Sequence, residues 1–191
     1  MSELTPDSGL PQAVPPYVDG ARRMTQAQFL QYTPQPFLLF PRSTLWDPLL
    51  LQVQASGAEG ATKVVSYDVQ TGGYSFICPI RKRKQNDDPR IYLGRVSKHN
   101  DMVIPVSSVS SRHACFLNPN VSMSGKWAIM DLSSSNGTWV NDEGITPNTE
   151  VPLESGVSLR LGGNLIAWFF DAPDFYQVLI DDQKLQYYVS Y

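Results

Sequence analysis

A regular succession of short apolar runs, separated by turn residues, is the feature that most constrains the fold of this chain. The runs recur roughly every 8–12 residues, which is the spacing typical of an all-β sandwich or barrel. No helical pattern alternates with them, so a parallel α/β sheet is not expected. The fold class predicted is all-β, an antiparallel β-sandwich over residues 62–170. The nine runs that build it are 64–69, 74–80, 91–93, 102–104, 114–117, 127–130, 138–140, 158–161 and 165–170.

The N-terminal third of the chain lacks this rhythm. Residues 1–22 are rich in proline, glycine and serine and offer few apolar side chains, so we expect a flexible tail that buries too little surface to offset its ordering entropy. Residues 23–61 are interpreted as an extension packed on the sandwich. It contains a short helix that Thr25 can cap.

Three further segments are assigned by their apolar patterns. The Phe37–Phe40 run between two prolines indicates a strand or a docked segment, and residues 46–54 indicate one or two helical turns. Residues 171–191 are predicted to be a C-terminal extension. Its apolar spacing favours a helix, with a final strand as the alternative.

Composition excludes several classes of protein. Hydrophobic residues make up 42% of the 191 residues, enough to build a core. The net charge of −3 argues against a nucleic-acid-binding protein, because such proteins normally carry an excess of basic residues. No run of about 18 apolar residues or N-terminal signal pattern occurs, so neither a membrane partner nor secretion is expected. Two cysteines, Cys78 and Cys115, are too few for a disulfide framework, and we expect a cytoplasmic protein.

The inventory of reactive side chains does not indicate an enzyme. The chain has two histidines, His99 and His113, and both cysteines lie inside apolar runs, where a thiol is usually inert. No phosphate-binding loop, nucleophile elbow or metal-ligand spacing occurs. We therefore expect a protein without catalytic residues, cofactor or bound metal.

Three polar clusters fall in loops between the predicted strands. They are Gly94-Arg95, then Ser110-Ser111-Arg112-His113, and then residues 133–138, Ser-Ser-Ser-Asn-Gly-Thr. Loops at one end of an antiparallel sandwich converge in space, on a rigid scaffold. These clusters are the candidate binding residues.

The order and spacing of these clusters resemble the forkhead-associated (FHA) domain, a phosphothreonine-recognition module. The resemblance covers about residues 62–170 and rests on Gly94-Arg95, Ser110-x-x-His113 and Asn136-Gly137-Thr138. It implies a sandwich of about eleven strands that binds phosphothreonine peptides through loops at one edge. It also implies that the histidine is architectural and holds the loops rather than acting as a base.

The residue types at these positions suit a phosphate. The planar guanidinium of Arg95 can pair with two phosphate oxygens, and the Ser110 hydroxyl can donate a hydrogen bond to the phosphate without adding a competing charge. Arg112 can supply a second positive charge, since a phosphothreonine carries about −1.5 to −2. Ser111 can contribute a hydroxyl or a backbone amide. The alternatives are that Arg95 is an ordinary surface arginine, that Ser110 is a turn serine bonded to its own backbone, and that Arg112 is solvated.

The third cluster is expected to hold the peptide. Asn136-Gly137 is a tight-turn signal, and the Asn136 amide has both a donor and an acceptor for an extended main chain. Ser135 is expected to border the peptide. Structural support of the site is assigned to Gly94, His113, Gly137 and Thr138. Preference for threonine over serine requires a small apolar niche for the methyl group, whose residues the sequence does not define.

Two other motifs carry alternatives. The basic run of residues 81–84, Arg-Lys-Arg-Lys, could bind nucleic acid or act as a targeting signal, but the aspartates that follow favour a solvated loop between strands. That loop could raise the positive potential near the phosphate site. Thr25 follows two arginines, a context compatible with phosphorylation and docking on the site of the same or another molecule.

The sequence thus predicts a non-catalytic phosphopeptide-binding module. Its partner is a protein or peptide carrying phosphothreonine, with a Ser/Thr kinase as the indirect regulator. The alternative is a phosphate-independent interaction or assembly scaffold that uses the same sandwich.

Overall fold

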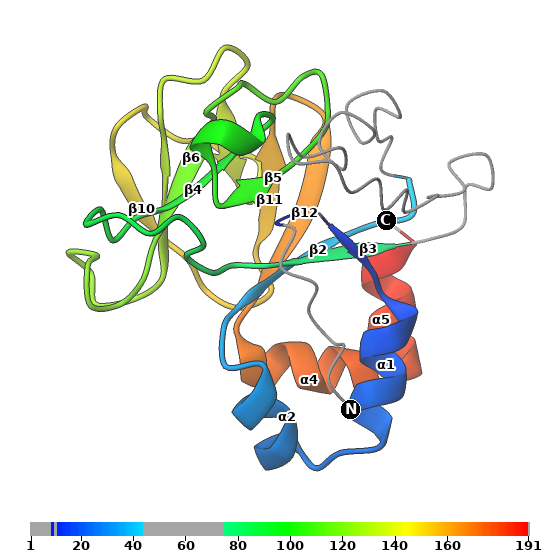
Figure 1. Ribbon diagram of the computed structural model, residues 1–191. Coiled ribbons are helices and arrows are strands. Elements are labelled where there is room, and N and C mark those ends of the chain that lie inside the picture. The colour runs from blue at the N-terminus through cyan, green and yellow to red at the C-terminus, as the bar shows by residue number, and fades with distance from the viewer. Residues whose placement is uncertain (1–8, 10, 44–74, 191) are drawn as a thin grey trace, which may run out of the picture.

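A computed structural model describes residues 9, 11–43 and 75–190 of the chain. Two β-sheets face each other, and helices lie along one of them (Figure 1). The seven-stranded sheet has the order β1-β3-β2-β12-β11-β8-β9, and the five-stranded sheet has the order β10-β7-β6-β4-β5. The strands are β1 Gln12–Ala13, β2 Phe37–Phe40, β3 Phe76–Pro79, β4 Ile91–Gly94, β5 Met102–Val103, β6 Ala114–Leu117, β7 Ala128–Asp131, β8 Thr138–Val140, β9 Glu143–Gly144, β10 Glu150–Pro152, β11 Ser158–Leu161 and β12 Leu165–Phe170.

The predicted sandwich, with helices at both ends of the chain, is confirmed. Strand pairs in the described residues are antiparallel except β4 with β5, where Leu93 lies beside Met102 in a parallel ladder. A short 3₁₀-helix, η1 (Ser97–His99), supplies the crossover between these two strands. It follows directly on the predicted Gly94-Arg95 cluster.

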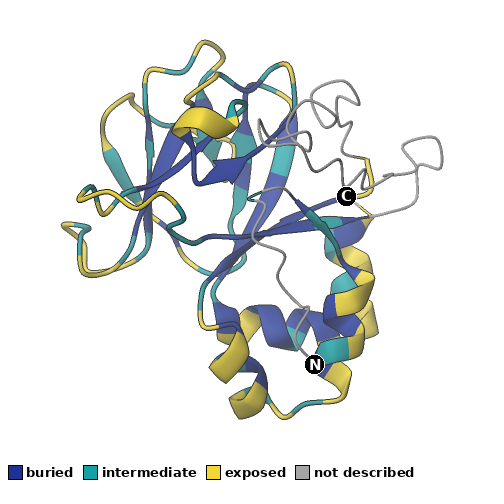
Figure 2. Cartoon of the chain, in the orientation of Figure 1, coloured by how far each residue is buried: buried dark blue, intermediate teal, exposed yellow. Residues whose placement is uncertain are grey.

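The central strands β2 and β12 are buried on both faces. In β2, Leu38 and Phe40 enter the core between the sheets, whereas Phe37 and Leu39 face the helices. A strand covered on both sides needs apolar residues at every position, which explains the uninterrupted Phe-Leu-Leu-Phe run. The buried strands stand out from the exposed loops in Figure 2. Of the two interpretations of residues 37–40, the strand is correct.

The helical layer consists of α1 (Pro15–Arg22), α2 (Gln26–Tyr32), α4 (Ala172–Ile180) and α5 (Asp182–Val189). It covers the outer face of the seven-stranded sheet through apolar side chains from both ends of the chain. Phe175 of α4 stacks on Phe37 of β2 with ring centroids 4.3 Å apart. The C-terminal helix was predicted, and the alternative of a final strand is wrong.

The expectation of a tail over residues 1–22 is wrong for the part that the structure describes. Residues 12–13 form β1, which pairs with β3, and residues 15–22 form α1. Pro15 and Pro16 occupy the first turn of α1, where proline lacks only an amide hydrogen that has no helical partner. Tyr17 is 1% exposed, because it packs edge-on against Phe37. The prolines therefore mark a helix start and not a segment without a core.

The N-terminal boundary of the sandwich also differs from the expected residue 62, since β1 and β2 belong to the seven-stranded sheet. Thr25 caps α2 as predicted: its hydroxyl accepts from the Gln28 amide, and the Gln28 side chain accepts in return from the Thr25 amide. The strand expected at 64–69 and the helical turns expected at 46–54 lie outside the described residues. Across the ranges the structure describes, no helix has the length and apolarity to cross a membrane.

Because Phe175 joins the helical layer to the sheet, Phe175→Ala should cost about 3–5 kcal/mol of the free energy of unfolding. Urea titration followed by tryptophan fluorescence measures this loss. Tyr187→Ala is the matched control, since Tyr187 lies in α5 with 64% of its surface exposed. Its effect should stay below about 1 kcal/mol. Equal effects of the two substitutions would show that α4 does not anchor the layer.

Candidate functional site

The structure brings the three predicted loops together. The Arg95 amide donates to the Ser110 carbonyl over 2.9 Å. The Ser110 hydroxyl accepts from the Ser135 amide over 2.9 Å, and the Asn136 side-chain amide donates to the Ser108 carbonyl over 2.8 Å. These bonds connect the loop after β4, the loop before β6 and the loop between β7 and β8. Arg95, Ser110, Ser135 and Asn136 therefore lie in one cluster.

His113 connects the same loops from beneath. Its side chain is 0% exposed. Nδ1 accepts from the Ser110 amide over 3.1 Å, so the proton of the neutral ring is on Nε2, which lies 3.1 Å from the Gly137 carbonyl and donates to it. Burial lowers the pKa of His113 below its ordinary value, although Asp131 and the Gly137 carbonyl act in the opposite direction. Its geometry is that of a loop support with both ring nitrogens occupied.

Arg95 is held by its own neighbours. Its Nε donates to the Val109 carbonyl over 3.1 Å, which fixes the plane of the guanidinium beside Ser110. The side chain is half-buried. Ser135 and Asn136 are exposed, as a surface that meets a peptide requires.

Arg112 lies elsewhere. Its guanidinium is stacked over the Tyr92 ring, 3.9 Å from the centroid, on the outer face of the five-stranded sheet. It makes none of the bonds that join the three loops. Ser111 is exposed, and its carbonyl accepts from the Asn100 side chain over 2.7 Å.

Both predicted glycines are required by space or by backbone conformation. A Cβ on Gly94 would lie 2.5 Å from the Ser111 carbonyl oxygen, which no side chain tolerates. Gly137 has φ +77°, and a Cβ there would also meet the Trp139 ring at 3.0 Å. Any side chain at either position would disturb the contact between two site loops.

A carboxylate that sequence reasoning missed anchors the third loop. Asp131 is buried at the end of β7 and accepts from the Ser134 amide, the Ser134 hydroxyl and the Thr138 hydroxyl, over 2.6–2.9 Å. Burial alone would raise the pKa of Asp131, but these hydrogen bonds outweigh it and lower the pKa. The signal was its place two residues before the serine-rich turn that begins at Ser133. Thr138, predicted as a support, acts through this carboxylate.

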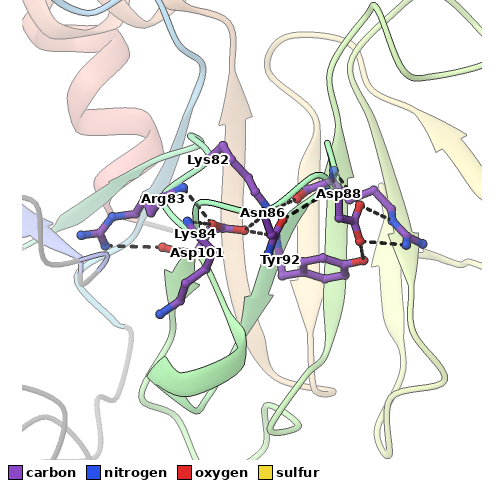
Figure 3. A network of polar contacts seen from close by, with 8 residues as sticks. Lys82, Arg83, Lys84, Asn86, Asp88, Tyr92 and Asp101 are labelled. Atoms are coloured by element: carbon purple, nitrogen blue, oxygen red, sulfur yellow. Dashed lines mark hydrogen bonds and ion pairs between the residues drawn. The ribbon is translucent and has the colours of Figure 1, made fainter. Parts of the chain in front are cut away.

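Three residues of the basic run, Lys82, Arg83 and Lys84, lie around another buried carboxylate, Asp101 (Figure 3). The amides of Arg83 and Lys84 donate to Asp101 Oδ1 over 2.8 Å and 2.6 Å. Oδ2 accepts from the Tyr92 amide over 2.9 Å and lies 3.4 Å from Lys82 Nζ. The run is therefore a structured loop tied to β4, and not the simple solvated loop that was predicted.

The two thiols have the character that the sequence indicated. Cys78 and Cys115 are both buried, and neither forms a disulfide. Burial raises the pKa of Cys78 to about 12 and that of Cys115 to about 11. Among the described residues, no three histidine, cysteine or carboxylate side chains lie together as metal ligands would.

Comparison with known proteins agrees with this geometry. Residues 91–162 match the family model of the FHA domain, a stretch that runs from β4 through β11 and includes every predicted site residue. The chain contains an FHA domain. An FHA domain-containing protein of Arabidopsis thaliana is 38% identical over 72 residues, which is 38% of this chain and 18% of that protein. A protein phosphatase 1 regulatory inhibitor subunit homologue of the same plant is 36% identical over 85 residues, 44% of this chain and 22% of the relative. The matches thus span about a fifth of these relatives.

Solved structures of FHA domains are also similar. The solution structure of an FHA domain from an Arabidopsis thaliana hypothetical protein has 28% identity and a TM-score of 0.40, covering 50% of this chain and 73% of that one. The N-terminal FHA domain of S. cerevisiae Rad53p, solved with a phosphothreonine peptide, has 21% identity and a TM-score of 0.41. That alignment covers 53% of this chain and 88% of the yeast domain.

The buried His113 of this FHA domain makes the stability depend on pH. Because its pKa is lower in the folded chain than the value of about 6.5 in the unfolded chain, the unfolded chain binds the proton more readily. The free energy of unfolding should therefore be highest above about pH 6.5 and decrease as the pH falls below it.

Urea titrations at pH 7.5 and pH 5.5 measure this decrease. At pH 7.5, His113→Gln should be less stable than the wild type. Between pH 7.5 and pH 5.5, it should lose less of its free energy of unfolding than the wild type does. His99→Gln, a change in the exposed η1 helix, should keep the wild-type pH dependence. An unchanged pH dependence in His113→Gln would contradict the assignment.

Proposed function

We propose that this chain is a non-catalytic module that recognises phosphothreonine on a partner protein in kinase-dependent signalling in the cytoplasm. FHA domains are phosphopeptide-recognition modules. The observation that carries the proposal is the convergence of Arg95, Ser110 and Asn136 at one edge of the sandwich, where the Ser110 hydroxyl already bonds to the Ser135 amide.

The phosphate would bind between Arg95 and Ser110. A guanidinium with a fixed plane offers two parallel hydrogen bonds to a phosphate dianion, and a hydroxyl adds a third without a competing charge. In the free structure the Ser110 hydroxyl lies 3.4 Å from the Ser135 hydroxyl, to which it donates. This weak contact can be exchanged for a charged acceptor at little cost.

The peptide backbone would lie along the exposed loop between β7 and β8. The Asn136 side chain now donates to the Ser108 carbonyl, which leaves its oxygen and its second amide hydrogen for a peptide main chain. Ser111 would border the phosphate from the loop before β6, next to Ser110. Because Arg112 is stacked on Tyr92, we assign it the long-range role of a positive charge rather than a direct contact.

Fluorescence anisotropy with matched peptides tests the proposal. Three peptides of one sequence, carrying threonine, phosphoserine or phosphothreonine, should bind in increasing order of affinity. Arg95→Ala should weaken phosphothreonine binding at least about tenfold, since each charge-assisted hydrogen bond contributes roughly 1.5–3 kcal/mol. Arg23→Ala, an exposed arginine just beyond α1, is the control and should bind as the wild type does. Affinity that ignores the phosphate would refute the proposal.

The layer of helices beside the sandwich favours a second function, a phosphate-independent interaction or assembly scaffold. Residues 12–40 and 172–189 lie outside the stretch that matches the FHA domain, and their helices add a surface of their own. Partners that remain bound after phosphatase treatment would favour this function over the first.

Docking of a phosphorylated Thr25 is not included in the proposal. Thr25 is exposed, but its hydroxyl caps α2, and the residues that follow are helical. An extended peptide around Thr25 would therefore require that α2 unwind and release Phe29 from the core.

A further inference from the structure

Asn100 is a buried polar residue next to the site, between η1 and β5, and only 2% of its surface is exposed. Its Nδ2 donates to the Val96 carbonyl over 2.7 Å and to the Ser111 carbonyl over 2.7 Å. Val96 follows Arg95 in one site loop, and Ser111 follows Ser110 in the other. One side-chain amide thus bridges the two loops that carry the candidate phosphate contacts.

The amide must point in this direction. Carbonyl oxygens only accept hydrogen bonds, so the group between them has to be the nitrogen. The Oδ1 atom of Asn100 is buried and has no hydrogen-bond partner within the described part of the chain. The side chain is therefore held through its two donated bonds alone, which is a role that an aspartate cannot fill.

The backbone bonds between the same loops provide less support. Arg95 donates to Ser110 over 2.9 Å, but the next bond, from the Val96 amide to the Ser111 carbonyl, is 3.4 Å long. A bond of that length is near the limit of a useful hydrogen bond. The shorter bonds from Asn100 therefore set the spacing of the loops beyond Arg95.

Gly94 leaves the space that Asn100 occupies. A Cβ on Gly94 would lie 2.7 Å from Asn100 Nδ2 and 2.5 Å from the Ser111 carbonyl oxygen. Glycine at position 94 therefore leaves room for the Asn100 side-chain amide to bond to both loops next to Arg95.

We propose that Asn100 is a positioning residue for phosphopeptide binding: its amide fixes the separation of Arg95 and Ser110, so that both reach the same phosphate. This inference rests on the proposed function. Two groups that share one ligand bind it well only if their spacing is set before the ligand arrives. Without the donor, two carbonyls lose a partner and the loops can separate.

Three variants of the full chain test the inference. Asn100→Ala removes the bridge, and Asn100→Asp keeps the shape of the side chain but removes both donated hydrogens. Thr33→Val is the control, because it deletes one hydrogen bond, from a 1% exposed hydroxyl to the Phe29 carbonyl, in the distant helical layer. Each variant is compared with the wild type in thermal stability and in affinity for a phosphothreonine peptide.

Both Asn100 variants should bind the phosphothreonine peptide at least about tenfold more weakly at a temperature where they are fully folded. The affinity of Thr33→Val for the peptide should stay within twofold of the wild-type value, even if its melting temperature falls as much as those of the Asn100 variants. Wild-type affinity in Asn100→Asp would overturn the inference, since the donated hydrogens would then be dispensable. An equal loss of affinity in Thr33→Val would also overturn the inference, because the weaker binding would then be explained by lost stability alone.

Amide hydrogen exchange separates this inference from the proposed function. In the unliganded protein, the Arg95 and Val96 amides should exchange faster in Asn100→Ala than in the wild type, while the β12 amides do not change. If the wild type binds no phosphopeptide, the proposed function fails, but faster exchange still supports the bridge. Unchanged exchange at Arg95 and Val96 would overturn it.

Discussion

The imidazole of His113 accepts a hydrogen bond from the Ser110 amide and donates one to the Gly137 carbonyl, at 3.1 Å each. These two bonds cross from one site loop to another in a place that water does not reach. A buried ring with both nitrogens satisfied favours one arrangement of the loops over all others. The positions of Ser110 and Asn136 at the surface follow from that arrangement, as does the tight turn at Gly137.

The frame beneath these loops is rigid because its central strands have no exposed face. One side of β2 and β12 packs against the five-stranded sheet and the other against the helical layer. Because these strands pack into the core on both sides, the loops that carry Arg95, Ser110 and Asn136 can present polar groups at the surface. Two buried carboxylates, Asp131 and Asp101, complete the frame by collecting the amide hydrogens of loops that no strand pairs.

The sandwich could be predicted from the sequence because short apolar runs and turn residues are local signals. The same signals placed the three polar clusters in loops, which the structure brings together. It predicted the N-terminal region poorly. Pro15 and Pro16 suggested disorder, but the burial of Tyr17 depends on Phe37, which no local pattern can reveal. Candidate site residues that lie in a motif could be named from the sequence, whereas Asn100 and Asp131 could not. Asn100 acts through bonds between two loops, and Asp131 acts through bonds within one turn, and neither pattern marks itself in the sequence. The phosphate contact expected of Arg112 stays a prediction, and its stacking on Tyr92, a residue of a neighbouring strand, could not be foreseen from the motif.

Titration of the ¹⁵N-labelled protein with a phosphothreonine peptide, followed by amide chemical shifts, shows directly whether these loops bind the phosphopeptide. The largest changes should fall on the amides of Arg95, Ser110, Ser135 and Asn136, together with the amide of His113. The amides of α1 and α4 should keep their shifts. Changes confined to the helical layer, or the same response to the unphosphorylated peptide, would show that the loops held by His113 are not a phosphate site.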